Sequence, residues 1–61
     1  MKLAIKWRYP NEEEIHSHTF YGIDPKTVGI HYGILGFGTG DPLESWIFQI
    51  SHVVEMEMEE E

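Results

Sequence analysis

The stretch VVEMEMEEE, residues 53–61, raises the question that decides the fold of this chain: is it an acidic tail or a half-buried strand? Apolar residues at positions 54, 56 and 58 alternate with glutamates at 55, 57 and 59. A period of two is typical of a strand with one buried face, whereas a disordered tail has no reason to alternate. The stretch therefore predicts a strand up to about Met58, with Val54, Met56 and Met58 facing inward and residues 59–61 fraying into solvent.

The beginning of the chain offers this strand a partner. In MKLAIKWRY, apolar residues at positions 3, 5, 7 and 9 alternate with residues that include Lys2, Lys6 and Arg8. This pattern predicts a first strand with one apolar and one basic face, which ends at Pro10 and Asn11. If the first and last strands pair, opposite charges meet across the ladder, and each pair contributes roughly 0.2–1 kcal/mol.

Size and composition exclude several classes of protein. The 61 residues form one small domain, 1–61, near the length at which folding buries only about 60% of the unfolded surface, so a roomy catalytic cleft is not expected. The chain has no cysteine and therefore no disulfide framework or thiolate metal site. No apolar run approaches a membrane span, and the N-terminal stretch is too short and too polar for a signal peptide. We expect a cytoplasmic protein without membrane contact.

The charge is distributed unevenly along the chain. Residues 1–30 contain four basic and four acidic residues, whereas residues 31–61 contain seven acidic residues and no basic one, so the second half carries the whole net charge of −7. Direct binding to nucleic acid is disfavoured, because phosphate contacts need Lys and Arg. A basic protein is the natural partner.

Between the two terminal strands, the turn chemistry of Asp24, Pro25, Lys26 and Thr27 predicts a hairpin over residues 15–35. With Ile23 opposite Val28, the core face contains Ile15, Tyr21, Ile23, Val28, Ile30, Tyr32 and Ile34. The opposite face contains His16, His18, Phe20, Gly22, Gly29, His31, Gly33 and Leu35. Residues 11–14, an Asn followed by three glutamates, fit either a capped helical turn or a solvated loop.

The glycines in GFGTGDP, at positions 36, 38 and 40, lack the spacing of a phosphate-binding loop and predict a flexible connector. The following DPLESWIFQISHVVEM is ambiguous. Asp41, Pro42 and Glu44 form a good helix start, but the many Trp, Ile, Phe and Val residues favour two strands with a break near Ser51 and His52. In the strand version, Trp46, Phe48 and Ile50 face inward.

The segment WIFQISHVVEM resembles the strand, single turn and last strand that end an SH3-like barrel. The expected fold class is therefore all-β, a small antiparallel sheet that curls into a four- to five-stranded SH3-like barrel, with or without one short helical turn. The resemblance covers about eleven residues of hydrophobic pattern and implies no functional residue.

The sequence offers few candidates for chemistry. Serines 17, 45 and 51 have no base at a recognisable spacing, so no catalytic activity and no cofactor are expected. In the hairpin register, His31 lies diagonal to His18, and His16, His18 and His31 form either a zinc site, a pH-responsive patch or a set of plain surface histidines.

The candidate binding surface is the acidic edge, formed by Asp41, Glu44, Glu55, Glu57 and Glu59. Three of these glutamates repeat about every 6.6 Å along a strand, so the edge is either a DNA mimic that replaces phosphates or a device against sheet aggregation. Its size and acidity are similar to those of small proteins encoded by phages and mobile elements. The leading hypothesis is an inhibitor of a basic, nucleic-acid-handling protein. The alternative is a module, homodimers included, that docks a peptide or a subunit through Tyr9, Tyr32, Phe37 and Trp46.

Overall fold

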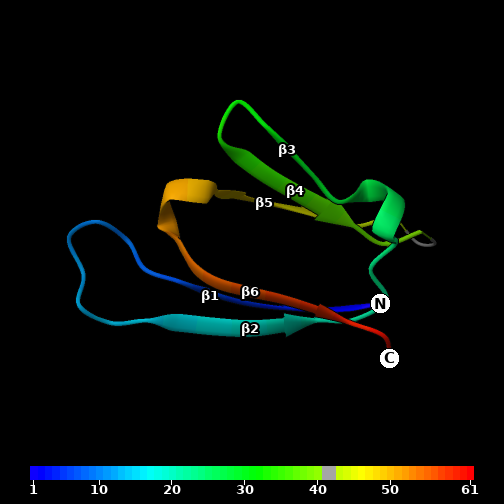
Figure 1. Ribbon diagram of the computed structural model, residues 1–61, viewed down its shortest axis with the longest axis horizontal. Coiled ribbons are helices and arrows are strands. Elements are labelled where there is room, and N and C mark those ends of the chain that lie inside the picture. Colours follow the sequence, from blue (N-terminus) through cyan, green and yellow to red (C-terminus); the bar gives the residue numbers. More distant parts are fainter. Residues whose placement is uncertain (41–42) are drawn as a thin grey trace.

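A computed structural model describes residues 1–40 and 43–61 and contains six strands (Figure 1). They are β1 (Lys2–Trp7), β2 (His16–Phe20), β3 (Gly29–His31), β4 (Ile34–Gly38), β5 (Ser45–Gln49) and β6 (Val53–Glu59). The only helical segments in this part of the chain are the single 3-10 turns η1 (Pro25–Thr27) and η2 (Ile50–His52). The prediction of an all-β protein is confirmed.

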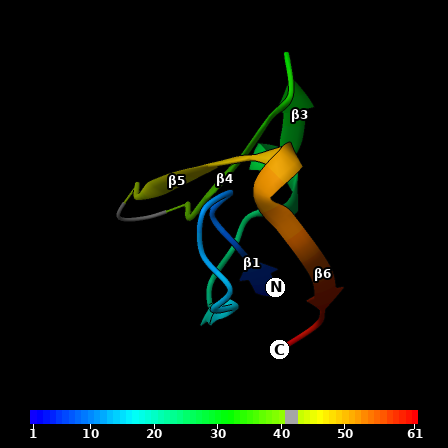
Figure 2. The same cartoon turned by 90° about the vertical axis from the view of Figure 1, so that its left-hand side faces the viewer.

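The strands form two three-stranded antiparallel sheets, with the orders β2-β1-β6 and β3-β4-β5. The sheets lie one above the other, and their strands cross at an angle (Figures 1 and 2). Across the two described segments, the sheets are joined by the isolated bridge between Ile23 and Thr39. They form no closed barrel, so the predicted curling of four to five strands into a barrel is not found. The backbone N–H of Ile23 also donates to the Met1 carbonyl at 2.8 Å. Ile23 therefore ties the two sheets together.

The core lies between the two sheets. Its buried members are Leu3, Ile5, Phe20, Ile23, Leu35 and Phe37, and half-buried side chains such as Trp7, Trp46 and Phe48 pack around them. Phe20 contacts Phe37 and Trp46 at ring-centroid distances of 5.0 and 4.9 Å. Aromatic residues therefore supply much of the core, as a chain of this length requires.

The C-terminal stretch is a strand that pairs with β1, as the alternation predicts. Leu3 lies opposite Met58 and Ile5 opposite Met56, which places both methionines on the inward face. A bulge follows, because Lys6 pairs with Glu55 but Trp7 pairs with Val53. Val54 is the extra residue of this bulge and is 54% exposed, so its predicted inward position is wrong.

The predicted fraying is wrong for Glu59, whereas residues 60 and 61 are exposed and lie outside the strand. Glu59 still belongs to β6, and the Glu61 carboxylate accepts a hydrogen bond from the backbone N–H of Gly22. Residues 12–14 form an exposed loop without a helical turn, which confirms the solvated alternative.

The predicted hairpin over residues 15–35 is not formed, because β2 pairs with β1 and β3 pairs with β4. The turn chemistry itself is present: the Asp24 carboxylate caps η1 by accepting from the Lys26 N–H at 3.0 Å. This turn, however, leads the chain from one sheet to the other. The tight hairpin lies instead at Tyr32 and Gly33, whose φ angles of 51° and 74° suit a two-residue turn.

Because the predicted hairpin is wrong, several residues of this segment were assigned to the core or to the outer face incorrectly. Ile23 is buried as expected, but Ile15, Tyr21, Ile30 and Tyr32 are exposed. Phe20 and Leu35, predicted to lie on the outer face, are core residues. The physical reason is that β2 takes its register from β1, which places Phe20 beside the buried Leu3.

The ambiguous segment forms strands in its described part, with β5, η2 and β6 in that order, so the helical alternative is wrong there. Asp41 and Pro42, the expected helix start, lie outside the described residues. Trp46 and Phe48 are half-buried and pack against the core, whereas Ile50 lies in η2 instead of β5. The break predicted near Ser51 and His52 coincides with η2.

Two of the three connector glycines belong to β4, so the predicted flexible connector is wrong for Gly36 and Gly38. A Cβ on Gly38 would lie 2.5 Å from the backbone oxygen of Glu44, whereas a Cβ on Gly40 would meet nothing within 4 Å. Gly38 is therefore needed for the close approach of two backbone segments.

We predict that Gly38→Ala lowers the free energy of unfolding by about 1–3 kcal/mol, because the added methyl collides with backbone that cannot rotate away. Gly40→Ala is the matched control and should change it by less than about 0.5 kcal/mol. Urea titration of both variants measures the difference. Equal stabilities would contradict the backbone approach at Gly38.

We also predict that deletion of residues 53–61 unfolds the protein, since it removes β6 and exposes the buried Leu3 and Ile5 of β1. Deletion of Glu60 and Glu61 alone is the control and should preserve a cooperative thermal transition. The measurement is far-UV circular dichroism during heating. A cooperative transition in the longer deletion would show that β6 is dispensable.

Candidate functional site

The acidic row, defined as Glu55, Glu57 and Glu59, lies on the outer face of β6. Because side chains alternate along β6, these glutamates lie on the face that points away from the inward methionines. Across the ladder, the row faces Lys6, Ala4 and Lys2 of β1, respectively. Opposite charges therefore meet between the first and last strands, as the sequence predicted.

Two of the three carboxylates are engaged in ion pairs. Lys2 Nζ lies 3.4 Å from Glu59 Oε2, and Lys6 Nζ lies 3.5 Å from Glu55 Oε2. All four side chains are well exposed, so each pair stabilises the fold by less than about 1 kcal/mol. Glu57 lies opposite Ala4 and has no ion pair with any described residue. The two end carboxylates of the row therefore have lysine partners, whereas the central carboxylate has no ion-pair partner among the described residues.

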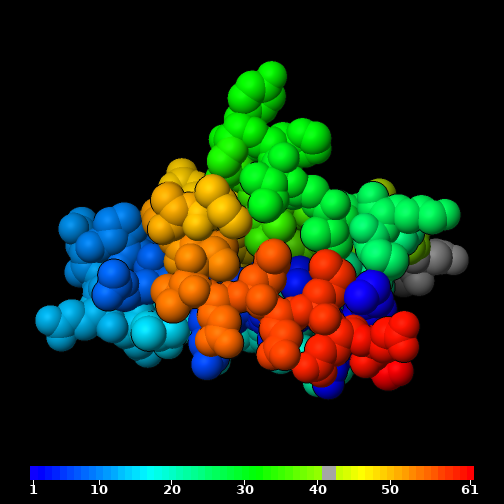
Figure 3. Space-filling view, in the orientation of Figure 1, coloured from blue at the N-terminus to red at the C-terminus, as the bar shows by residue number. Residues whose placement is uncertain are grey.

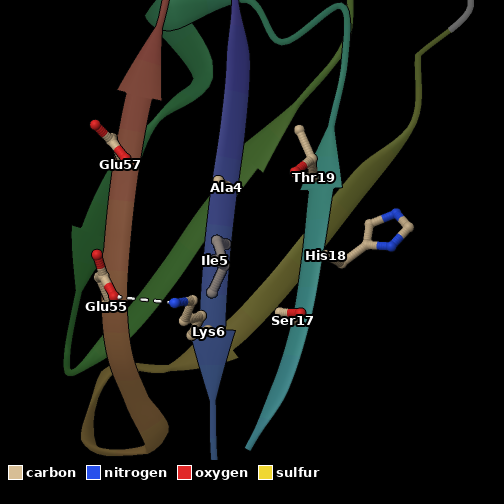
Figure 4. A pocket seen from close by; sticks show the side chains of 8 residues that line it. All are labelled: Ala4, Ile5, Lys6, Ser17, His18, Thr19, Glu55 and Glu57. Atoms are coloured by element: carbon tan, nitrogen blue, oxygen red, sulfur yellow. Dashed lines mark ion pairs between the residues drawn. The ribbon is translucent and has the colours of Figure 1, made fainter.

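A shallow pocket lies beside this central carboxylate (Figure 4). Its lining comes from three neighbouring strands and comprises Ala4, Ile5, Lys6, Ser17, His18, Thr19, Glu55 and Glu57. Because the side chain of Ala4 is short, the outer face is recessed at the middle of β1. Glu57 and Thr19 flank this recess on the two adjacent strands. The Lys6–Glu55 ion pair bounds one end.

The chemistry of this pocket suits a cation. A carboxylate without a protein counter-ion can accept a charge-assisted hydrogen bond from an ammonium or guanidinium group. The hydroxyl groups of Ser17 and Thr19 lie on the same outer face and offer further acceptors. One basic side chain of a partner fits this arrangement.

The structure does not add the other two predicted acids to the row. Glu44 lies in the segment before β5, in the other sheet, where its backbone N–H donates to Thr39 Oγ1 at 3.0 Å. Asp41 lies outside the described residues. The acidic site of the structure is therefore the row on β6.

The four predicted docking aromatics do not form one surface. Tyr32 is fully exposed at the tip of the β3–β4 hairpin, whereas Tyr9 is 46% exposed and contacts His16 and His52. Phe37 is a buried core residue, and Trp46 is half-buried against it, because the inward face of the β4–β5 pair contains both. Only the two tyrosines are freely available.

Sequence reasoning missed an apolar pocket on another side of the molecule. It is lined by Trp7, Tyr9, Ile34, Ile47, Phe48, Gln49 and His52. Ile47 is 74% exposed, because β5 places Trp46 and Phe48 inward and the residue between them outward. The alternation of the segment contained this signal.

The three histidines do not converge as the hairpin register implied. His16 and His18 lie on the inward face of β2, opposite Trp7 and Ile5, whereas His31 belongs to β3 in the other sheet. Within residues 1–40 and 43–61, no group of three His, Asp or Glu side chains is arranged to hold a metal ion. His16 stacks on Trp7 at 5.6 Å, and His18 packs on Phe20 at 4.5 Å.

Comparisons with known proteins give the chain no family. No protein-family model matches it, and neither the curated proteins nor the solved structures contain a match. A search of the described residues for a membrane-spanning helix finds none of sufficient length and apolarity.

The inward position of two histidines generates a prediction. His16→Ala and His18→Ala should each lower the free energy of unfolding by about 0.5–1.5 kcal/mol, because each removes an aromatic contact. His31→Ala is the control and should change it by less than about 0.5 kcal/mol. Denaturant titration compares the three variants. If His31→Ala is the most damaging of them, the inward face of β2 is wrongly assigned.

Proposed function

We propose that this chain is a small non-catalytic binding protein that docks onto a basic protein through the acidic row of β6. The observation that carries the proposal is the central carboxylate: Glu57 is held at fixed strand spacing beside a pocket, without a counter-ion among the described residues. A rigid, unpaired charge attracts a cationic group without the entropy cost of ordering a tail.

The partner class follows from charge. The net charge of −7 steers the chain toward basic surfaces, and nucleic-acid-handling proteins present such surfaces where they bind phosphates. Carboxylates about 6.6 Å apart along β6 then occupy positions that phosphates take in the natural complex. Occupation of that surface inhibits the partner by exclusion, and no bond needs to be made or broken.

A second candidate function is supported by the apolar pocket and by the order of the strands. Two three-stranded sheets with a 3-10 turn before the last strand support the SH3-like alternative, although the described residues form no closed barrel. Such a module docks a peptide, a subunit or a second copy through the pocket that contains Tyr9 and the exposed Ile47. Ionic strength separates the two functions, because charge-driven binding weakens with salt whereas apolar docking does not.

The test of the acidic row is a capture experiment with matched charge variants. The protein is immobilised and exposed to a nuclease-treated cell lysate, and the bound proteins are eluted with salt or with duplex DNA. Glu55→Gln, Glu57→Gln and Glu59→Gln, combined in one chain, should reduce the bound basic proteins about tenfold at low salt, with a smaller difference as salt rises. Duplex DNA should release the proteins that the wild-type chain has captured, because it competes for the same surface of the partner.

The control combines Glu12→Gln, Glu13→Gln and Glu14→Gln, which removes the same charge from the exposed β1–β2 loop. It should retain the basic proteins, because net charge is equal in the two variants and only position differs. If both variants lose binding equally, net charge acts without a site. If the row variant binds as the wild type does, the acidic row is not the docking surface.

A further inference from the structure

β6 is an edge strand, and its backbone edge that faces away from β1 is not paired with another described strand. In the sheet order β2-β1-β6, its ladder is with β1, so its other side presents backbone N–H and C=O groups that no strand within the described residues satisfies. Figure 2 shows β6 and β3, the edges of the two sheets, on the same side of the molecule. This side is one of the two along which the sheets are not joined into a barrel.

Inward-facing apolar side chains are incompletely covered along this open side. Met56 and Met58 share the face of the buried Ile5 and Leu3, yet they remain 39% and 36% exposed. Ile30 of β3 lies opposite the buried Leu35 and is 54% exposed. In the space-filling view, the C-terminal strand runs across the molecular surface without a covering element (Figure 3). A strand added beside β6 would bury these side chains.

The two faces of β6 specify what such a strand must contain. On the outer face, an added strand meets the acidic row, with Glu57 lacking a counter-ion among the described residues. On the inner face, it meets the two methionines. Because side chains alternate along a strand, basic residues must alternate with apolar ones. β1, which reads KLAIKW and pairs with the other side of β6, follows this pattern except at Ala4, opposite Glu57.

We propose that the free edge of β6 binds an extended segment of the basic partner in which basic and apolar residues alternate, by addition of a strand to the sheet. The proposal rests on the proposed function, since it assumes a basic partner, and it adds the form that the partner takes at the site. Backbone hydrogen bonds supply affinity, and the alternating side chains supply specificity.

A second copy of this chain does not fit the edge. Pairing of β6 with β6 across a two-fold axis would set one acidic row against the other, and like charges opposite each other destabilise a ladder. The glutamates that attract a basic strand therefore also prevent self-pairing, which an unprotected edge would invite.

The experiment uses the full chain and a defined probe, a capped peptide with the sequence of residues 1–8, MKLAIKWR. Binding is followed by fluorescence anisotropy, and backbone pairing is followed by amide hydrogen exchange. We expect saturable binding, together with slower exchange of amides in residues 53–59. A peptide of the same composition with its basic residues consecutive should bind roughly tenfold more weakly, because it cannot present one basic and one apolar face.

Matched variants separate strand addition from attraction by charge alone. Glu57→Gln should weaken peptide binding, and Met56→Gln with Met58→Gln should weaken it about tenfold without a change in charge. Leu43→Gln is the control, because Leu43 is an exposed apolar residue that lies outside β6 and does not line the apolar pocket. If the methionine variant loses its cooperative thermal transition, Ile30→Gln replaces it, since Ile30 lies on the same open side.

Each other outcome overturns the proposal. Binding that depends on Glu57 but neither slows exchange in β6 nor responds to the methionines would leave the acidic row as a docking surface without strand addition. Absence of saturable peptide binding would refute the proposal of strand addition. The lysate experiment tests the proposed function separately. A concentration-dependent dimer, seen by sedimentation with β6 protected before peptide is added, would assign the edge to a second copy.

Discussion

The pairing of β1 with β6 is the interaction on which the remaining structure depends. It joins the first and last strands, places Leu3 and Ile5 against the second sheet, and leaves the charged residues outside. Burial of one such apolar side chain contributes about 1.5–3 kcal/mol, whereas an exposed ion pair contributes less than about 1 kcal/mol. The apolar faces therefore stabilise the pair, and this register adds the exposed ion pairs of Lys2 with Glu59 and of Lys6 with Glu55.

The same pairing determines the charge of the proposed binding surface. Lys2 and Lys6 form exposed ion pairs with Glu59 and Glu55, the two ends of the acidic row. Ala4 carries no charge, so the central Glu57 of the row has no ion pair within residues 1–40 and 43–61. The small and uncharged Ala4 in the middle of β1 therefore explains two features. Glu57 lacks an ion pair among the described residues, and the surface beside it is recessed to form the pocket.

The two open sides of the sandwich explain why a chain of this size retains so much exposed apolar surface. Six strands in two separate sheets leave four edges, and inward-facing residues near an edge are covered on one side only. Met56, Met58 and Ile30 are exposed for this reason, although their pairing partners are buried. Sequence alternation predicts which face a side chain takes, but it does not reveal whether its strand lies at an edge.

The sequence by itself determined the all-β class, the strands at both ends of the chain, and the opposition of Lys2 and Lys6 to the acidic row, because alternation and charge are visible in short segments. Tertiary structure decided the rest. The turn at Asp24 is compatible with a hairpin or with a crossing between sheets, and either face of residues 16–20 could point inward. Contacts of Phe20 with Phe37 and Trp46, distant in sequence, favour the crossing, because that path packs the three aromatic rings against one another.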